Sequence, residues 1–330
     1  MAAAPLLSVG RVLGSLRRSW LLWALVLSTV VACAPRRREP EPVGHGDPSP
    51  APETPAPAGG GTAAPPTRTG PLDVTFAVVS DTHLGFDGNE EKNRALVASI
   101  ATLPGMRYPG GAAVGHVRGL LVAGDLTEWG NTYEWEAFCD VYGLGRGEKP
   151  GSPFPVFEVV GNHDMVHGPW LAAEVAKRHP GGGAYTWDWD DVHLVGLGES
   201  PDGPALDALE RDLAKTPVER PLVLLFHRPL AGPWLEDRPD AEARARLARL
   251  LSGREVLGIF HGHHHARAHY VWQGYDVWKP GAVKGGAPEL AVAHVDDERF
   301  TVRTYDWQSR RFVDLFTKRR PKRPTSAPRR

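Results

Sequence analysis

Five short apolar runs, each followed within two residues by an Asp, Asn or His, constrain the fold of this chain more than any other feature. The runs are residues 74–79, 119–123, 157–160, 222–226 and 256–260. Runs of this length and composition are typical of strands that are buried on both faces of a sheet. Buried strands of this kind occur in α/β proteins, where helices cover the sheets.

Longer amphipathic segments alternate with these runs and predict helices. They lie at residues 90–103, 132–142, 169–177, 204–214 and 240–251. Because strand and helix alternate, parallel pairing with helical crossovers is expected. Strand-like alternation also fills the C-terminal third, at residues 270–272, 289–295, 300–306 and 312–315, where we expect antiparallel strands of a second sheet. The predicted fold is an α/β sandwich of two β-sheets flanked by helices.

Side chains that commonly bind metals stand at the ends of all five runs. They are Asp81 and His83, Asp125, Asn162, His227, and His263 with His265. In open α/β sheets, ligands gather beyond the carboxyl ends of the strands, where several loops converge. A single Asp there is often a turn residue or a helix cap, and a single His is often structural. Recurrence at five strand ends instead predicts a shared metal site.

The motifs at these positions resemble those of the calcineurin-like metallophosphoesterases. The matching motifs are Asp-x-His at 81 and 83, Gly-Asp at 124 and 125, Gly-Asn-His-Asp at 161–164, His227, and Gly-His-x-His at 262–265. The resemblance covers residues 74 to about 316. It implies a double-sheet fold and two metal ions that share a bridging carboxylate.

By position in the motifs, the resemblance assigns the ligands. It implies that Asp81, His83 and His265 bind one metal, that Asn162, His227 and His263 bind the other, and that Asp125 bridges the two. Mixed imidazole and carboxylate donors suit Mn, Fe, Zn or Co better than Ca or Mg. Two such ions a few ångströms apart would activate a water for in-line attack at phosphorus.

His163 lies inside a matching motif but outside the expected set of ligands. The resemblance implies that it contacts the phosphate and protonates the leaving oxygen, with Asp164 orienting its imidazole. The alternative is a purely supporting role for His163. Purple acid phosphatases, a branch of this superfamily, carry a tyrosine three residues after the Gly-Asp aspartate. This chain has Glu128 there, so it is not expected to belong to that branch.

The leading functional hypothesis is a dinuclear-metal-dependent hydrolase of phosphomonoesters or phosphodiesters. The alternative is a non-catalytic binding or sensor protein that keeps the fold without turnover. Loss of ligands would favour the alternative, and no expected ligand is missing. Two further residues have two possible roles each: Trp129 is expected either to wall a pocket or to cover the core edge, and Arg228 to pair with a phosphate oxygen or with a carboxylate.

The N-terminus has the layout of a secretory signal, with basic residues before an apolar run at 20–31. That run is shorter than the roughly 20 residues that span a bilayer. Ala32 and Cys33 resemble the lipobox of bacterial lipoproteins, so residues 1–33 are expected to be a signal peptide that ends at a lipidated Cys33. The alternative is an ordinary signal peptide with an incidental Cys33. The chain is therefore expected to be exported and membrane-anchored, on the periplasmic or cell-surface side.

Segments of biased composition flank the expected domain, residues 72–317. Residues 34–71 are rich in Pro, Ala and Gly and predict a disordered tether. Residues 318–330 are basic and predict either a solvated tail or one attracted to anionic polymers. A net charge of −1 indicates no specific nucleic-acid partner. The expected partners are a phosphate-ester substrate and the membrane, and the domain is expected to be a monomer.

Overall fold

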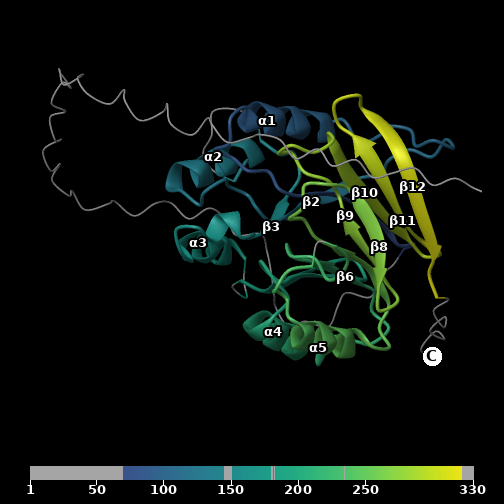
Figure 1. The fold of residues 1–330 in the computed structure, drawn as a ribbon. Helices are drawn as coiled ribbons and strands as arrows, with labels where there is room; N and C mark the ends of the chain where they lie inside the picture. Colours follow the sequence, from purple (N-terminus) through teal and green to yellow (C-terminus); the bar gives the residue numbers. More distant parts are fainter. Residues whose placement is uncertain (1–69, 145–150, 180, 182, 234, 322–330) are drawn as a thin grey trace, which may run out of the picture. The chain divides into compact units, whose positions relative to one another are not determined.

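The computed structural model describes residues 70–144, 151–179, 181, 183–233 and 235–321 (Figure 1). The predicted signal peptide, Cys33, the tether up to residue 69 and the tail beyond residue 321 lie outside the described residues. No helix within the described ranges is both long and apolar enough to span a membrane.

The first sheet has six strands in the order β12-β11-β10-β1-β2-β3. Its strands are β1 (Asp73–Val79), β2 (Val117–Ala123), β3 (Val156–Val159), β10 (Glu289–Asp296), β11 (Arg299–Asp306) and β12 (Arg311–Arg319). β1, β2 and β3 pair in parallel, and β10 pairs antiparallel with the other edge of β1. Two antiparallel pairings then add β11 and β12.

The second sheet also has six strands, in the order β4-β5-β6-β7-β9-β8. Its strands are β4 (Tyr185–Trp189), β5 (Val192–Gly196), β6 (Leu222–Leu225), β7 (Val256–Phe260), β8 (Ala268–Trp272) and β9 (Tyr275–Lys279). β5, β6, β7 and β9 pair in parallel, and the two edge strands, β4 and β8, pair antiparallel.

Three apolar clusters hold the sheets and helices together. Along β1, Phe76 and Val78 belong to the cluster between the sheets, whereas Ala77 and Val79 belong to the cluster under the helices, as the two-residue period of a strand requires. The helices on the first sheet are α1 (Asn89–Ile100), α2 (Thr132–Tyr142) and α3 (Trp170–Arg178). The second sheet is covered by α4 (Gly203–Leu213) and α5 (Ala241–Leu251), seen beside β6 in Figure 1.

The predicted α/β sandwich of two sheets flanked by helices is confirmed. The placement of the C-terminal strands in a second sheet is wrong for β10, β11 and β12. β10 pairs with the edge of β1 that β2 leaves open, so these three strands extend the first sheet. The second sheet is instead built around β6 and β7, which the sequence placed with the earlier parallel strands.

The predicted start of the basic tail at residue 318 is also wrong. β12 runs to Arg319, and Lys318 contacts both the Val256 carbonyl, at 3.1 Å, and Asp276, at 2.9 Å. Arg320 is buried and ion-paired with Glu255 at 2.6 Å. Contacts with β7, β9 and Glu255 hold Lys318 and Arg320, and pairing with Arg299 of β11 holds Arg319, so these three residues belong to the domain.

His193 of β5 links the second sheet to α4 through two carboxylates. Its Nδ1 lies 2.6 Å from Asp188 of β4, and its Nε2 lies 2.8 Å from Asp212 of α4. Although burial opposes the charged imidazole, these two hydrogen bonds raise the pKa of His193. The same contact outweighs burial at Asp188 and, with Arg220, lowers the pKa of that carboxyl.

We expect His193→Gln to destabilise the fold in a pH-dependent way. The raised pKa means that the stabilisation is complete below the unfolded value of about 6.5 and is lost as the pH rises through the folded value. Hydrogen bonds to charged groups contribute about 1.5–3 kcal/mol, so a loss of about 2 kcal/mol is expected at pH 6 and a smaller loss at pH 9.

Urea unfolding at the two pH values, with the same metal loading, measures this difference. The control is His294→Gln, because His294 pairs with Asp73, whose side chain is 68% exposed. An equal loss for His193→Gln at both pH values would contradict the assigned charge on His193.

Candidate metal centre

The loops that follow five strands meet where the two sheets adjoin. The backbone N–H of Asp81, after β1, donates to the Gly124 carbonyl after β2 at 3.0 Å. The N–H of His263, after β7, donates to the Asp81 carboxylate at 2.9 Å, and Gly262 donates to the His227 carbonyl at 3.1 Å. Main-chain contacts therefore link the carboxyl ends of strands from both sheets.

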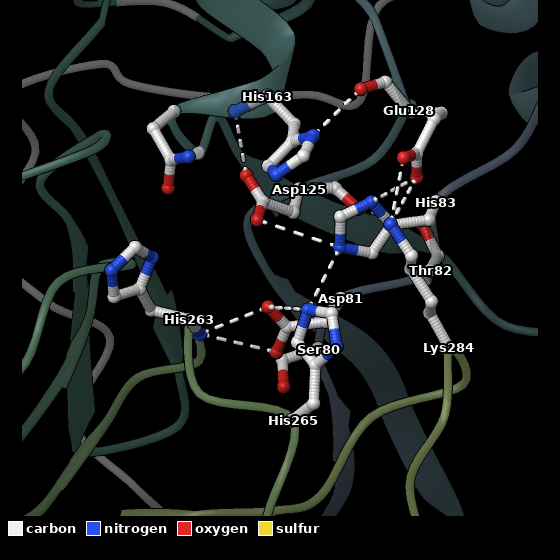
Figure 2. Close-up of polar contacts among 12 residues, drawn as sticks. Ser80, Asp81, Thr82, His83, Asp125, Glu128, His163, His263, His265 and Lys284 are labelled. Atoms are coloured by element: carbon white, nitrogen blue, oxygen red, sulfur yellow. Dashed lines mark hydrogen bonds and ion pairs between the residues drawn. The ribbon is translucent and has the colours of Figure 1, made fainter. Parts of the chain in front are cut away.

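One group of donor atoms comes from the loops that follow β1, β2 and β7 (Figure 2). It consists of Asp81, His83, Asp125 and His265, whose candidate ligand atoms lie within 4.8 Å of one another. His83 Nε2 is 3.1 Å from His265 Nε2 and 3.5 Å from Asp125 Oδ2. Imidazole nitrogens bound about 2.1 Å from one ion lie at about such a separation from each other.

A second group contains Asp125, His227 and His263, with Asn162 beside it. His227 Nε2 lies 3.0 Å from Asn162 Oδ1, 3.2 Å from His263 Nδ1 and 3.3 Å from Asp125 Oδ2. His227 Nδ1 donates to the Ala123 carbonyl at 2.9 Å, which turns Nε2 toward the group. Asp125 belongs to both groups, at the position expected for a bridging ligand.

The backbone at these residues is held in an unusual conformation. Eight non-glycine residues among those described have positive φ, and five of them are predicted ligands. The five are Asp81 (53°), His83 (43°), Asp125 (51°), His263 (83°) and His265 (46°). Left-handed conformations of non-glycine residues cost roughly 1–3 kcal/mol each and cluster at functional sites. The strain therefore marks the same residues as the motifs.

Two glycines of the motifs allow the close approach of these side chains. A Cβ at Gly161 would lie 2.2 Å from Asp125 Oδ1, and a Cβ at Gly124, whose φ is +83°, would lie 2.5 Å from His227 Nδ1. No larger residue fits at either position without moving Asp125 or His227. The packing of the site therefore requires glycine directly before Asp125 and directly before Asn162.

The electrostatics of the buried donors fit cations. Burial, together with the neighbouring Asp125, raises the pKa of Asp81 to about 7. Burial lowers the pKa of His83 to about 2 and that of His265 to about 4, so both imidazoles are neutral, as metal binding requires. Burial opposes the charged form of His227, but the Asp125 carboxylate raises the pKa of His227 to about 9. Its imidazole is therefore protonated at neutral pH, and a bound metal would displace one proton from it.

His163 lies beside the first group, on the short 3-10 helix His163–Met165 that follows β3. Its backbone N–H donates to Asp125 Oδ1 at 2.9 Å, and its Nδ1 lies 2.7 Å from the Glu128 carbonyl. Because a carbonyl only accepts, Nδ1 carries the proton there, and Nε2 is the nitrogen that remains for a substrate. The rings of His163 and His83 are 4.6 Å apart.

Asp164 does not orient the His163 imidazole, so that prediction is wrong. Its carboxylate is buried and accepts from Leu126 N, from Gly161 N, and from both N and Oγ1 of Thr127, at 2.7–3.1 Å. These bonds tie the loop after β2 to the loop after β3. The Glu128 carbonyl orients the imidazole instead.

Acidic side chains contact two of the predicted ligands, and the sequence prediction did not identify them. Glu128 Oε2 lies 2.8 Å from His83 Nδ1, and Glu236 Oε1 lies 2.9 Å from His263 Nε2. Arg228 is ion-paired with Glu199 at 2.9 Å and with Glu236. Of its two expected partners, a phosphate oxygen or a carboxylate, the structure shows the carboxylate. No local motif marks these contacts, because the partners of each histidine come from other loops.

One exposed aromatic residue borders His163. Trp129 is 50% exposed, with its ring centroid 6.2 Å from that of His163. Trp170, by contrast, donates from Nε1 to the Gly130 carbonyl at 2.8 Å and packs against the core under the helices. Trp129 is therefore exposed next to His163, whereas Trp170 supports the loop that contains Gly130.

Comparison with solved structures shows the same fold in distant proteins. GAP50, the anchor in the inner membrane complex of Plasmodium, aligns with a TM-score of 0.53 at 13% identity, over 76% of this chain and 90% of its own. The purple acid phosphatase PPD1 of yellow lupin seeds aligns with a TM-score of 0.55 at 13% identity, over 81% of this chain and 59% of its own. No curated protein matches the sequence. At such identities these likenesses concern the fold alone.

A family model gives the relationship by sequence. The model described as calcineurin-like phosphoesterase matches residues 74–267, which is more than half of the 330-residue chain and includes every predicted ligand. Members of this family typically bind two metal ions, and the two groups of donors around Asp125 are clusters that could hold them. By its sequence and its fold, the chain belongs to the calcineurin-like phosphoesterase family.

Proposed function

We propose that this chain is a metal-dependent phosphoester hydrolase, acting on phosphomonoesters or phosphodiesters. The observation that carries the proposal is the sharing of Asp125 by two donor groups, with His163 beside them. The residues proposed to hold two divalent or mixed-valence ions (Mn, Fe, Zn or Co) are Asp81, His83, His265, Asn162, His227 and His263, with Asp125 between them. Bound metals would supply Lewis-acid activation of water and of a phosphate oxygen.

The protein side chains have distinct tasks in this reaction. Protonated on both nitrogens, His163 gives the Nε2 proton to the leaving oxygen and is left as a neutral imidazole, while Nδ1–H stays fixed on the Glu128 carbonyl. The His163 N–H on Asp125 Oδ1 keeps this proton donor at a set distance from the bridging carboxylate. Asp164 holds the two loops that carry Asp125 and His163 in register. Positioning of this kind is a large part of phosphoryl-transfer catalysis.

The alternative is a tethered binding or sensor protein of the same fold. It would keep both metals and bind a phosphate ester without turning it over. The complete donor set and the orientation of His163 support turnover instead, because a binding protein needs no oriented proton donor.

Turnover of phosphate esters tests the proposal. Purified protein is loaded with Mn, Fe, Zn or Co, its metal content is measured, and phosphate release is followed from a panel of mono- and diesters. Hydrolysis that needs bound metal is the expected result. Two bound metals without hydrolysis of any ester would sink the enzymatic proposal and favour the sensor.

Export and lipid anchoring are a separate proposal that rests on the sequence alone. We expect Cys33→Ser to move the exported protein from the membrane fraction to the soluble fraction, because one thioether-linked lipid is lost. Fractionation of bacterial cells that express the full chain measures this shift, and gel filtration of the released protein tests the expected monomer. Unchanged membrane retention would contradict an anchor at Cys33.

A further inference from the structure

Glu128 contacts two imidazoles of the site with different parts of the same residue. It stands three residues after Asp125 and is buried. Its carboxylate oxygen Oε2 lies 2.8 Å from His83 Nδ1, within ion-pair range but not aligned as a hydrogen bond, and its backbone carbonyl accepts from His163 Nδ1 at 2.7 Å (Figure 2). One residue thus reaches both a predicted metal ligand and the predicted proton donor.

Lys284, in the segment after β9, caps the Glu128 carboxylate. Its Nζ lies 2.7 Å from each carboxylate oxygen, and only 18% of its side chain is exposed. Its backbone N–H donates to the Asp81 carbonyl at 3.2 Å, and its Nζ lies 4.5 Å from the Phe86 ring centroid. These contacts hold the ammonium group in place from several sides.

The arrangement has a direct consequence for the tautomer of His83. His83 Nε2 faces His265 Nε2 at 3.1 Å and Asp125 Oδ2 at 3.5 Å, so it is the nitrogen on the side of the predicted metal. The negative carboxylate 2.8 Å from Nδ1 favours the proton on that nitrogen by electrostatic attraction and leaves the Nε2 lone pair for a metal. A buried carboxylate without a cation would be costly, and Lys284 offsets that cost.

We propose that Glu128 and Lys284 are a positioning pair for the metal centre. Lys284 holds Glu128, whose carboxylate fixes His83 with Nε2 toward the metal and whose carbonyl fixes His163 with Nε2 toward the substrate. The proposal rests on the metal centre of the proposed function and goes beyond it, because neither residue is a predicted ligand. It also gives Glu128 a task different from that of a ligand to the metal.

Cobalt binding by the full-length protein tests this pair. The affinity for Co²⁺ is measured by chelator competition, and the ligand-field absorption spectrum reports the coordination. Partners of metal ligands typically contribute about 10–100-fold in affinity, so Glu128→Gln and Lys284→Met are each expected to weaken Co²⁺ binding by about that factor and to change the spectrum. The double variant is expected to be no weaker than the worse single variant, because the two residues act as a unit.

Two further variants separate positioning from general stability. Lys284→Arg keeps the ion pair and is expected to restore the affinity and spectrum that Lys284→Met loses. Glu255→Gln removes a largely buried carboxylate, 9% exposed, from another ion pair, with Arg320, and is expected to leave Co²⁺ binding unchanged. If Glu128→Gln does not fold, the comparison of Lys284→Met with Lys284→Arg still tests the positioning pair.

Each result bears on one proposal or on both. Wild-type affinity and spectrum in Glu128→Gln, or equal losses for Lys284→Met and Lys284→Arg, would overturn the positioning pair. Co²⁺ binding by the wild type without phosphoester turnover would overturn the hydrolase and leave the pair to be judged on affinity. A wild-type protein that binds neither Co²⁺ nor any of Mn, Fe and Zn would overturn both.

Discussion

Asp125→Asn is expected to abolish phosphoester hydrolysis and to empty at least one of the two metal positions. Asp125 Oδ2 lies within 3.5 Å of a histidine in each donor group, so it is the only residue common to both groups. Asparagine keeps the shape but carries no charge, and its one amide oxygen cannot replace both Oδ2, which faces the two groups, and Oδ1, which accepts from His163 N. The loss in kcat/KM should exceed the roughly 10–100-fold that is typical for a residue that only supports a ligand.

Metal content and kcat/KM, measured on the same preparation, check this expectation. Asp276→Asn is a matched control, because Asp276 is partly buried and paired with His269 and Lys318 outside the donor groups. The control should keep both the metals and the rate. An Asp125→Asn variant with two metals and near wild-type turnover would contradict the bridging role.

Strand ends were predictable from the sequence because the signal is local. In β1, β2 and β7, a continuous apolar run ends within two residues of an Asp or His. Such a run is typical of a strand that is buried on both faces of its sheet. β4, β5 and β9 escaped prediction, because polar or charged residues interrupt them and leave no continuous apolar run. The sheet of β10 was misassigned, since its apolar residues would fit either sheet. Pairing with the distant β1 decides between them.

The candidate ligands were predictable for the same reason, whereas their supporting contacts were not. Each ligand lies in a short motif, but Lys284 reaches Glu128 across 156 residues of chain, and no motif joins them. The role of Asp164 was misjudged because it is adjacent in sequence to His163. In the 3-10 turn the two side chains diverge, and backbone N–H groups of the loop after β2 occupy the Asp164 carboxylate.

His163→Ala is expected to slow hydrolysis while both metals stay bound. His163 contacts Asp125, the predicted bridging ligand, through its backbone N–H, which alanine retains, so the donor groups should remain intact. Loss of a proton donor typically costs about 10²–10⁴-fold in rate. The cost should depend on the leaving group, because an alkoxide needs the proton far more than a p-nitrophenolate does.

The leaving-group dependence is what separates proton donation from other roles of His163. Phosphate release from alkyl and p-nitrophenyl esters is compared for His163→Ala and wild type, with metal content measured, and His269→Ala serves as a histidine control on β8. A large loss for the alkyl ester with a small loss for the p-nitrophenyl ester would support the acid. Equal losses for both would assign His163 to binding the phosphate, since a contact with the phosphoryl oxygens does not distinguish one leaving group from another. Nδ1 is already committed to the Glu128 carbonyl, so either role must be carried by Nε2.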